Sequence, residues 1–115
     1  WVGGGRPKGL DLLPLVQTLR RRAASAHVFG EAAAAVLALL RAQAPELTAR
    51  PAASVEAALD AALLAARPGD TILFSPAFSS FDQFHNFRER AERVAAWCRR
   101  GHQDAGAGTG QSAAL

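Results

Sequence analysis

Residues 71–90, TILFSPAFSSFDQFHNFRER, decide the fold class of this chain. The first five residues follow a Pro68-Gly69-Asp70 turn and form a largely apolar run, which is typical of a strand buried on both faces of a parallel sheet. A loop with hydroxyl groups follows, and then a helix that is predicted to reach about Arg100. In an open α/β sheet, ligands bind beyond the carboxyl ends of strands, where helix N-termini offer unpaired N–H groups. The segment therefore predicts an α/β fold with an anion-binding edge.

The rest of the chain alternates short strands with longer helices. Strands are predicted at residues 1–2, 26–29, 47–49 and 71–75. Helices are predicted from Asp11 or Pro14 to Arg22, at residues 31–42, at residues 55–66 with Ser54 as the N-cap, and after the loop described above. Strands that alternate with helices of this length indicate βαβ units with right-handed crossovers. The predicted fold class is α/β, a Rossmann-like three-layer domain with a mostly parallel sheet flanked by helices.

The length of 115 residues suits one domain with a single core, which is predicted at residues 1–100. From residue 101 onward Gly, Ala, Ser, Thr and Gln dominate, so residues 101–115 are predicted to form a disordered tail. The chain opens at Trp1 without an initiator methionine, and Trp1-Val2 runs straight into glycines as if a strand had been cut. We therefore expect a C-terminal fragment with a partner domain upstream.

Charge and composition argue against several classes of function. The 13 basic residues exceed the 10 acidic ones by only 3, and Lys8 is the only lysine, so nucleic-acid binding is not indicated. Cys98 is the only cysteine, which excludes an internal disulfide and a cysteine-based zinc site, and the three histidines are too scattered for a metal site. No apolar run approaches the ~20 residues that cross a bilayer, and no signal peptide is visible. The expected location is cytoplasmic, with no membrane partner.

The glycine-rich loop at residues 3–9 suggests nucleotide binding, but its spacing does not fit. A phosphate loop of the form G-x-x-x-x-G-K-[ST] needs Lys followed by Ser or Thr after Gly9, and the sequence lacks both. A dinucleotide fingerprint that starts at Gly3 needs a glycine where Lys8 stands. Lys8 follows the carboxyl end of a strand, where its ammonium group could meet a carboxylate or a phosphate. A solvated loop lysine fits the position equally well.

Two capping boxes compete for the start of the last helix. Ser80-x-x-Gln83 would start the helix directly after Ser80, whereas Asn86-x-x-Glu89 would start it at Phe87. In the second case the Phe87 backbone N–H has no intrahelical partner and the Ser80 hydroxyl is free, so both can bind the same anion. In the first case Ser80 is a plain N-cap. The phenylalanine rings of this segment are predicted to pack in the core.

Two motifs give residues 1–99 a family resemblance. Residues 4–11 read Gly-Gly-Arg-Pro-Lys-Gly-Leu-Asp, and residues 75–90 follow the pattern Ser-Pro-Ala-x-x-Ser-x-Asp-x-Phe-x-Asn-Phe-x-x-Arg. Both resemble the C-terminal domain of Mur ligases, specifically of those that add D-glutamate to UDP-N-acetylmuramoyl-L-alanine. Three positions depart from the family pattern. Arg6 and Pro7 stand where relatives can have an acid and a glycine, and Ala91 stands where the family usually has glycine.

The resemblance implies a three-domain cytoplasmic ligase of peptidoglycan synthesis that uses ATP and Mg²⁺ to join D-glutamate to UDP-N-acetylmuramoyl-L-alanine. Domains upstream of this chain would bind ATP, Mg²⁺ and the uridine nucleotide, so the fragment alone would be inactive and would carry no catalytic residue. In this domain Lys8 would hold the α-carboxylate side of D-glutamate. The Ser80 hydroxyl and the Phe87 backbone N–H would hold its side-chain carboxylate.

Two other functions remain open at this point. The chain could be a free-standing α/β binding module, or it could belong to a ligase of the same fold that adds diaminopimelate, lysine, or glutamate to folate. The upstream sequence separates a binding module from a ligase, because a ligase carries an ATP-binding glycine loop roughly 200 residues upstream.

Overall fold

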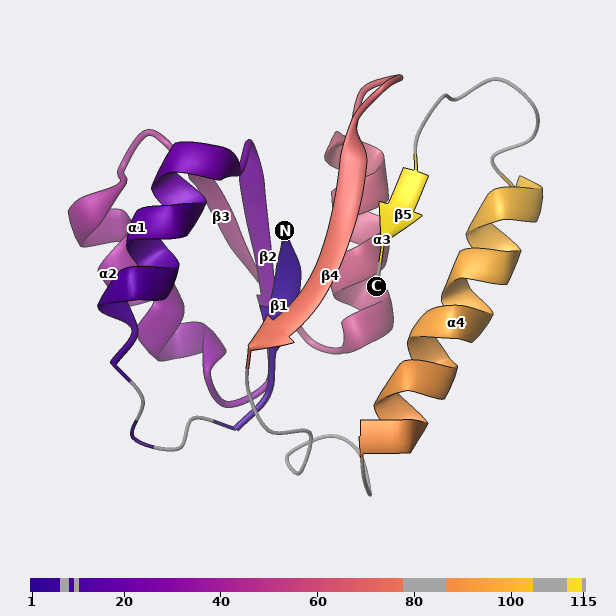
Figure 1. The fold of residues 1–115 in the computed structure, drawn as a ribbon, viewed down its shortest axis with the longest axis horizontal. Coiled ribbons are helices and arrows are strands. Elements are labelled where there is room, and N and C mark those ends of the chain that lie inside the picture. Colours follow the sequence, from indigo (N-terminus) through magenta and orange to yellow (C-terminus); the bar gives the residue numbers. More distant parts are fainter. Residues whose placement is uncertain (7–8, 10, 78–86, 105–111, 115) are drawn as a thin grey trace.

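A parallel sheet of five strands, in the order β3-β2-β1-β4-β5, forms the middle layer of the molecule (Figure 1). The computed structural model describes residues 1–6, 9, 11–77, 87–104 and 112–114. The strands are β1 (Val2–Gly4), β2 (Ser25–Phe29), β3 (Thr48–Ala52), β4 (Thr71–Ala77) and β5 (Ser112–Ala114). The helices are α1 (Leu13–Arg22), α2 (Ala33–Gln43), α3 (Val55–Ala65) and α4 (Phe87–Asp104). The predicted alternation of strands and helices is confirmed.

The path of the chain changes direction between β1 and β4. From β1 the chain proceeds to β2 and to β3 at one edge, and it returns through α3 to β4 on the other side of β1. The described strand pairs are all parallel, and Val2 pairs with both His27 and Phe74. This order matches five strands of the Rossmann order 3-2-1-4-5-6, so the predicted Rossmann-like fold with a parallel sheet is confirmed.

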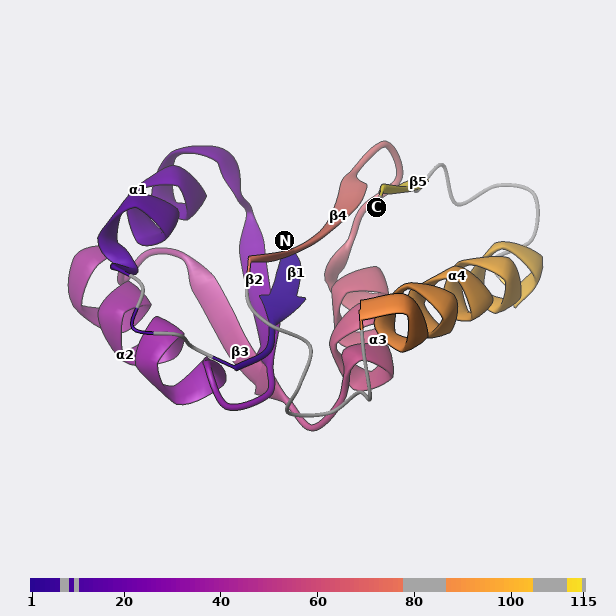
Figure 2. The same ribbon diagram turned by 60° about the horizontal axis from the view of Figure 1, so that its bottom comes forward.

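Helices cover both faces of the sheet (Figure 2). The buried apolar side chains form two separate layers between the helices and the sheet. Alternate residues of β2 point to opposite faces, so Val28 joins one layer and Phe29 the other. The α1/α2 layer consists of the buried residues Val16, Leu19, Ala26, Val28, Ala32, Val36, Leu37, Leu40 and Ala44. The α3/α4 layer consists of Val2, Phe29, Val55, Ala58, Leu59, Ala62, Ile72, Phe74, Val94 and Trp97.

Strand β1 contains two glycines, so the prediction of a loop at residues 3–9 is wrong for Gly3 and Gly4. A β-carbon on Gly3 would lie 2.1 Å from a ring carbon of Trp1, and one on Gly4 would lie 2.0 Å from the carbonyl oxygen of Phe29. Gly4 also has a φ angle of +148°, which side chains rarely adopt. These glycines are required by the close approach of neighbouring chain segments at the centre of the sheet.

Strand β3 and helix α4 extend farthest beyond their predicted ends. Strand β3 continues through Pro51, which is tolerated because β3 lies at an edge of the sheet. Helix α4 continues to Asp104, and Ser112–Ala114 pair with β4, where the composition predicted a disordered tail. The other residues of that predicted tail, 105–111 and 115, lie outside the described residues.

Candidate functional site

The candidate site lies at the carboxyl edge of β1 and β4. These strands are parallel neighbours, and Gly4 pairs with Ala77 where both strands end. The segment that contains Lys8 leaves β1 at this edge, and the segment that contains Ser80 leaves β4 at the same edge. The chain changes direction between these two strands, and in an open α/β sheet this is the place where a ligand crevice forms. The topology therefore brings the two predicted motifs to one edge.

The structure describes only one of the three predicted site residues. Lys8 and Ser80 lie outside the described residues, and so does Asn86. Helix α4 begins at Phe87, which confirms the helix start predicted by the second capping box. The Phe87 N–H, at the first position of this 18-residue helix, has no intrahelical acceptor, and it lies at the positive end of the helix dipole. The ligand contacts of the three residues stay predictions.

Hydrogen bonds lie at both ends of the segment that joins β1 to α1. At the first end, the Gly5 N–H donates to the Phe29 carbonyl oxygen at 3.3 Å, and the Ala32 N–H donates to the Gly5 carbonyl oxygen at 2.9 Å. At the other end, Oδ1 of Asp11 accepts from the Leu13 N–H at 3.0 Å, beside the start of α1. The loop is thus tied to the β2–α2 connection on one side and to α1 on the other.

Arg6, one of the departures from the family pattern, lies near the beginning of this loop. Its Nη2 atom is 3.4 Å from Oε1 of Glu31, and both side chains are about half exposed, at 48% and 55%. A surface pair of this kind contributes little to stability. The pair matters for the local charge. The carboxylate of Glu31 offsets the positive charge of Arg6, which is close in sequence to Lys8.

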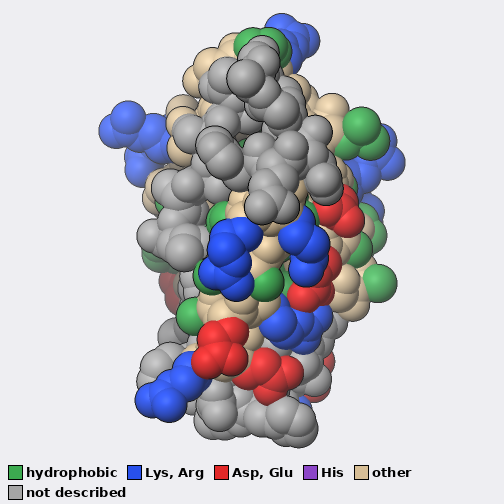
Figure 3. All heavy atoms as spheres, turned by 90° about the vertical axis from the view of Figure 1, so that its right-hand side faces the viewer, with side chains coloured by type: hydrophobic (Ala, Val, Ile, Leu, Met, Phe, Trp, Pro, Cys, Tyr) green, Lys and Arg blue, Asp and Glu red, His purple; other side chains and the backbone are tan. Residues whose placement is uncertain are grey.

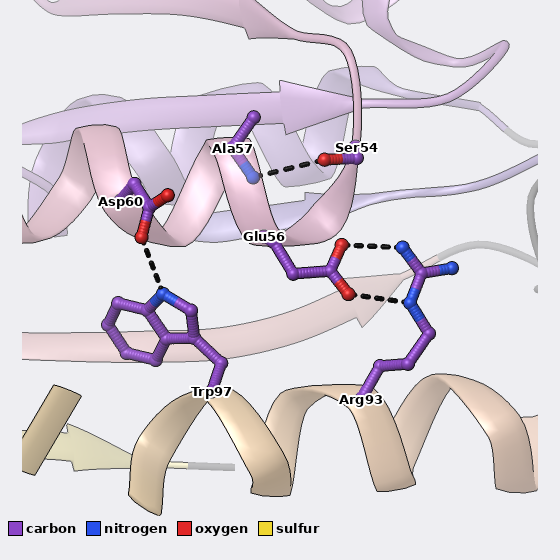
Figure 4. A network of polar contacts seen from close by, with 6 residues as sticks. All are labelled: Ser54, Glu56, Ala57, Asp60, Arg93 and Trp97. Atoms are coloured by element: carbon purple, nitrogen blue, oxygen red, sulfur yellow. Dashed lines mark hydrogen bonds and ion pairs between the residues drawn. The ribbon is translucent and has the colours of Figure 1, made fainter. Parts of the chain in front are cut away.

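Two polar contacts, one helical turn apart, hold α4 against α3 (Figure 4). Arg93 donates to both carboxylate oxygens of Glu56, from Nε to Oε1 at 2.6 Å and from Nη2 to Oε2 at 2.5 Å. The indole N–H of Trp97 donates to Oδ1 of Asp60 at 2.7 Å. Val94 lies on the same helix and is fully buried. The sequence analysis missed both contacts, because spacing rules find neighbours on one helix and the partners here lie on two.

The contact between Glu56 and Arg93 shifts both pKa values toward the ionised forms. The hydrogen bond from Arg93 lowers the pKa of the Glu56 carboxyl, and the same bond raises the pKa of the Arg93 guanidinium. The side chains are 28% and 33% exposed, so solvent screens this pair less than a fully exposed one. The bidentate geometry also fixes the orientation of the two groups.

The outward face of α4 carries charges of both signs. Figure 3 shows Lys/Arg and Asp/Glu side chains interspersed on this side of the molecule. The exposed charged residues of α4 include Arg88, Glu92, Arg99 and Arg100. Interspersed charges produce no extended field of one sign. The described part of this face is therefore unlike the continuous basic surfaces that bind nucleic acids.

A cavity of about 570 Å³ lies at the opposite edge of the sheet, where β2 and β4 begin. Its polar lining includes Thr18, Arg22, Ser25, Asp70, Thr71 and Ser75. This edge is opposite to the one at which β1 and β4 end, and parallel sheets bind ligands at the carboxyl ends of their strands. Within the described residues, no three His, Cys, Asp or Glu side chains gather into a metal site. None of the described helices has the length and apolar character of a membrane span.

Comparison with known proteins gives the family, although no family model matches the chain. Three curated relatives carry the name UDP-N-acetylmuramoylalanine–D-glutamate ligase. The chain is 40% identical to the relative from Chromohalobacter salexigens over 96 residues, 40% to that from Chlorobium phaeobacteroides over 92, and 40% to that from Salinibacter ruber over 91. The matches cover 84%, 80% and 79% of this chain but only 20%, 19% and 19% of the relatives. The chain therefore belongs to the family of the UDP-N-acetylmuramoylalanine–D-glutamate ligases, and it spans about one fifth of their length.

Proposed function

We propose that this chain is the C-terminal, amino-acid-binding domain of a cytoplasmic, ATP-dependent ligase of peptidoglycan synthesis. The whole enzyme would join D-glutamate to UDP-N-acetylmuramoyl-L-alanine and would thereby serve cell-wall biogenesis, cell shape and cell division. The main support is the convergence of the two motif-bearing segments at the carboxyl edge of β1 and β4. The names of the relatives agree with this substrate pair.

Three groups of this domain would hold D-glutamate. Lys8, a point charge with three donors, would bind the α-carboxylate side. The Ser80 hydroxyl and the Phe87 backbone N–H would bind the side-chain carboxylate, with support from the dipole of α4. Hydrogen bonds to a carboxylate are roughly twice as strong as neutral ones, so three of them can fix the position of a small amino acid.

The chemical task of the domain would be orientation. ATP and Mg²⁺ would supply the activation of the carboxylate of UDP-N-acetylmuramoyl-L-alanine. Residues outside this chain would hold most of both, because the glycine-rich loop lacks phosphate-loop spacing. Lys8, Ser80 and the Phe87 N–H would hold both carboxylates of D-glutamate and leave its amino group free to attack. Such positioning can lower a barrier by several kcal/mol.

Substitution of the two side chains in the full-length ligase tests the proposal. Ser80→Ala and Lys8→Ala should each raise the KM for D-glutamate by about tenfold or more, since each removes a charge-assisted bond worth ~1.5–3 kcal/mol. The KM for ATP serves as the control and should change little. An unchanged KM for D-glutamate in both variants would show that the residues do not hold this substrate.

The Phe87 N–H can be tested by a pair of variants at one position. Phe87→Pro removes the N–H at the first helical position, where proline is tolerated because this N–H has no intrahelical partner. Phe87→Ala keeps the N–H and changes only the side chain. We expect the proline variant to have a KM for D-glutamate about tenfold above that of the alanine variant. Equal KM values would remove the amide from the proposed site.

A further inference from the structure

Helix α4, which carries the Phe87 N–H, does not follow β4 directly. Residues 78–86 lie between the two elements in the sequence. Its position over the site therefore depends on what α4 packs against. The described contacts point to α3, which shares a buried cluster with Val94 and Trp97. Figure 4 shows both polar contacts bridging the same two helices.

The two contacts form a ladder with a fixed register. Glu56 and Asp60 are four residues apart on α3, and their partners Arg93 and Trp97 are four residues apart on α4, so a separation of 37 residues recurs in both contacts. This order requires that the two helices run side by side in the same direction. By helix geometry, Arg93 lies about 9 Å along α4 from Phe87, and Trp97 lies about 15 Å from it. The contact of Arg93 is thus the one nearer the site.

The α3 end of the nearer contact lies in a capped helical turn. Ser54 Oγ accepts from the Ala57 N–H at 3.1 Å and caps the first turn of α3, in which Glu56 lies. This turn follows β3 at the carboxyl edge of the sheet, which is also the edge of the candidate site. A bidentate arginine at this point constrains both the distance and the rotation of α4, whereas a single bond would constrain only a distance.

We infer that Glu56 and Arg93 form a positioning pair, which holds the N-terminus of α4 so that the Phe87 N–H faces the carboxylate of the amino-acid substrate. The inference rests on the proposed function and deepens it. Neither residue touches the substrate. The contact of Trp97 with Asp60 holds the same helices together, but it is about 6 Å farther from the site along the axis of α4.

The test compares Glu56→Gln with Asp60→Ala in the full-length ligase. Both variants should lower the Tm by similar amounts, because each breaks one contact between α3 and α4. Glu56→Gln should raise the KM for D-glutamate by about threefold to tenfold with little change in kcat, whereas Asp60→Ala should change the KM by less than about twofold. Arg93→Gln should match Glu56→Gln, and the double variant should raise the KM no further, since the residues act as one unit.

The outcomes separate this inference from the proposed function. If Ser80→Ala raises the KM for D-glutamate and Glu56→Gln does not, the pair is only structural and the inference alone is overturned. The inference is also overturned if Asp60→Ala raises the KM as much as Glu56→Gln does, or if the effects of Glu56→Gln and Arg93→Gln add. If Ser80→Ala and Lys8→Ala both leave the KM unchanged, the proposed function fails and the inference fails with it.

Discussion

The two helical layers of this domain are held to the sheet in different ways. The α1/α2 layer rests on apolar burial, and the N-cap residues of α1 and α2 make no side-chain capping bond. In the α3/α4 layer, a serine caps α3 and directional polar contacts join α3 to α4. Apolar burial tolerates small shifts, whereas a bidentate ion pair specifies an orientation. The layer that carries the predicted substrate contact is therefore the one with specified geometry.

The largest effect on stability is expected from a substitution in the apolar α1/α2 layer. Leu40→Ala on α2 removes a side chain that is 1% exposed, so it should lower the free energy of unfolding by about 2–5 kcal/mol through lost burial and a residual cavity. Urea unfolding of the chain measures this change. Leu64→Ala on α3 is the matched control, because Leu64 is 89% exposed and its loss should cost no more than about 0.5 kcal/mol. Equal losses of stability in the two variants would contradict the burial of Leu40 in the α1/α2 layer.

A medium effect is expected from the cap of α3. Ser54→Ala removes the acceptor for the Ala57 N–H and should lower the free energy of unfolding by ~1 kcal/mol. Ser54→Asp keeps an acceptor at the same place and should retain most of the stability. Thermal unfolding of both variants checks the prediction, and an alanine variant as stable as the aspartate variant would contradict it.

The smallest effect should come from the ion pair, and it should depend on pH. Arg93 lowers the pKa of Glu56 in the folded chain, so the pair stabilises the fold above the ordinary glutamate pKa and loses this contribution as the pH falls through the folded value. Glu56→Gln should cost about 1 kcal/mol or less at pH 7, and the difference from the wild type should vanish between about pH 5 and pH 3. Glu92→Gln, at an exposed position of α4, is the control. A difference that persists at low pH would show that the cost of Glu56→Gln does not arise from charge.

Local patterns predicted most of the fold. Three features depend only on residues that are close in sequence. They are the apolar run that forms β4, the alternation of strands and helices, and the Ser54 cap. The start of α4 at Phe87 was one of two predicted alternatives, and the structure distinguishes them. The path of the chain then explains why two distant motifs meet at one edge.

The rest of the structure depends on which elements become neighbours. The sequence places Glu56 and Arg93 on separate helices. These helices become neighbours only when β4 pairs with β1, and no rule of sequence spacing predicts such a contact. The need for glycine at Gly4 likewise arises from the position of the Phe29 carbonyl oxygen. The roles of Lys8 and Ser80 stay predictions from motif resemblance.

Strand β1 has only three residues, yet it lies between β2 and β4, and this has a consequence for folding. During synthesis, Val2 can find His27 early, but its second partner, Phe74, leaves the ribosome much later. Pairings between residues far apart in sequence slow folding, because the chain must close a long loop before it gains the contacts. The edge between β1 and β4, where the substrate is proposed to bind, is therefore among the last parts of the sheet to assemble.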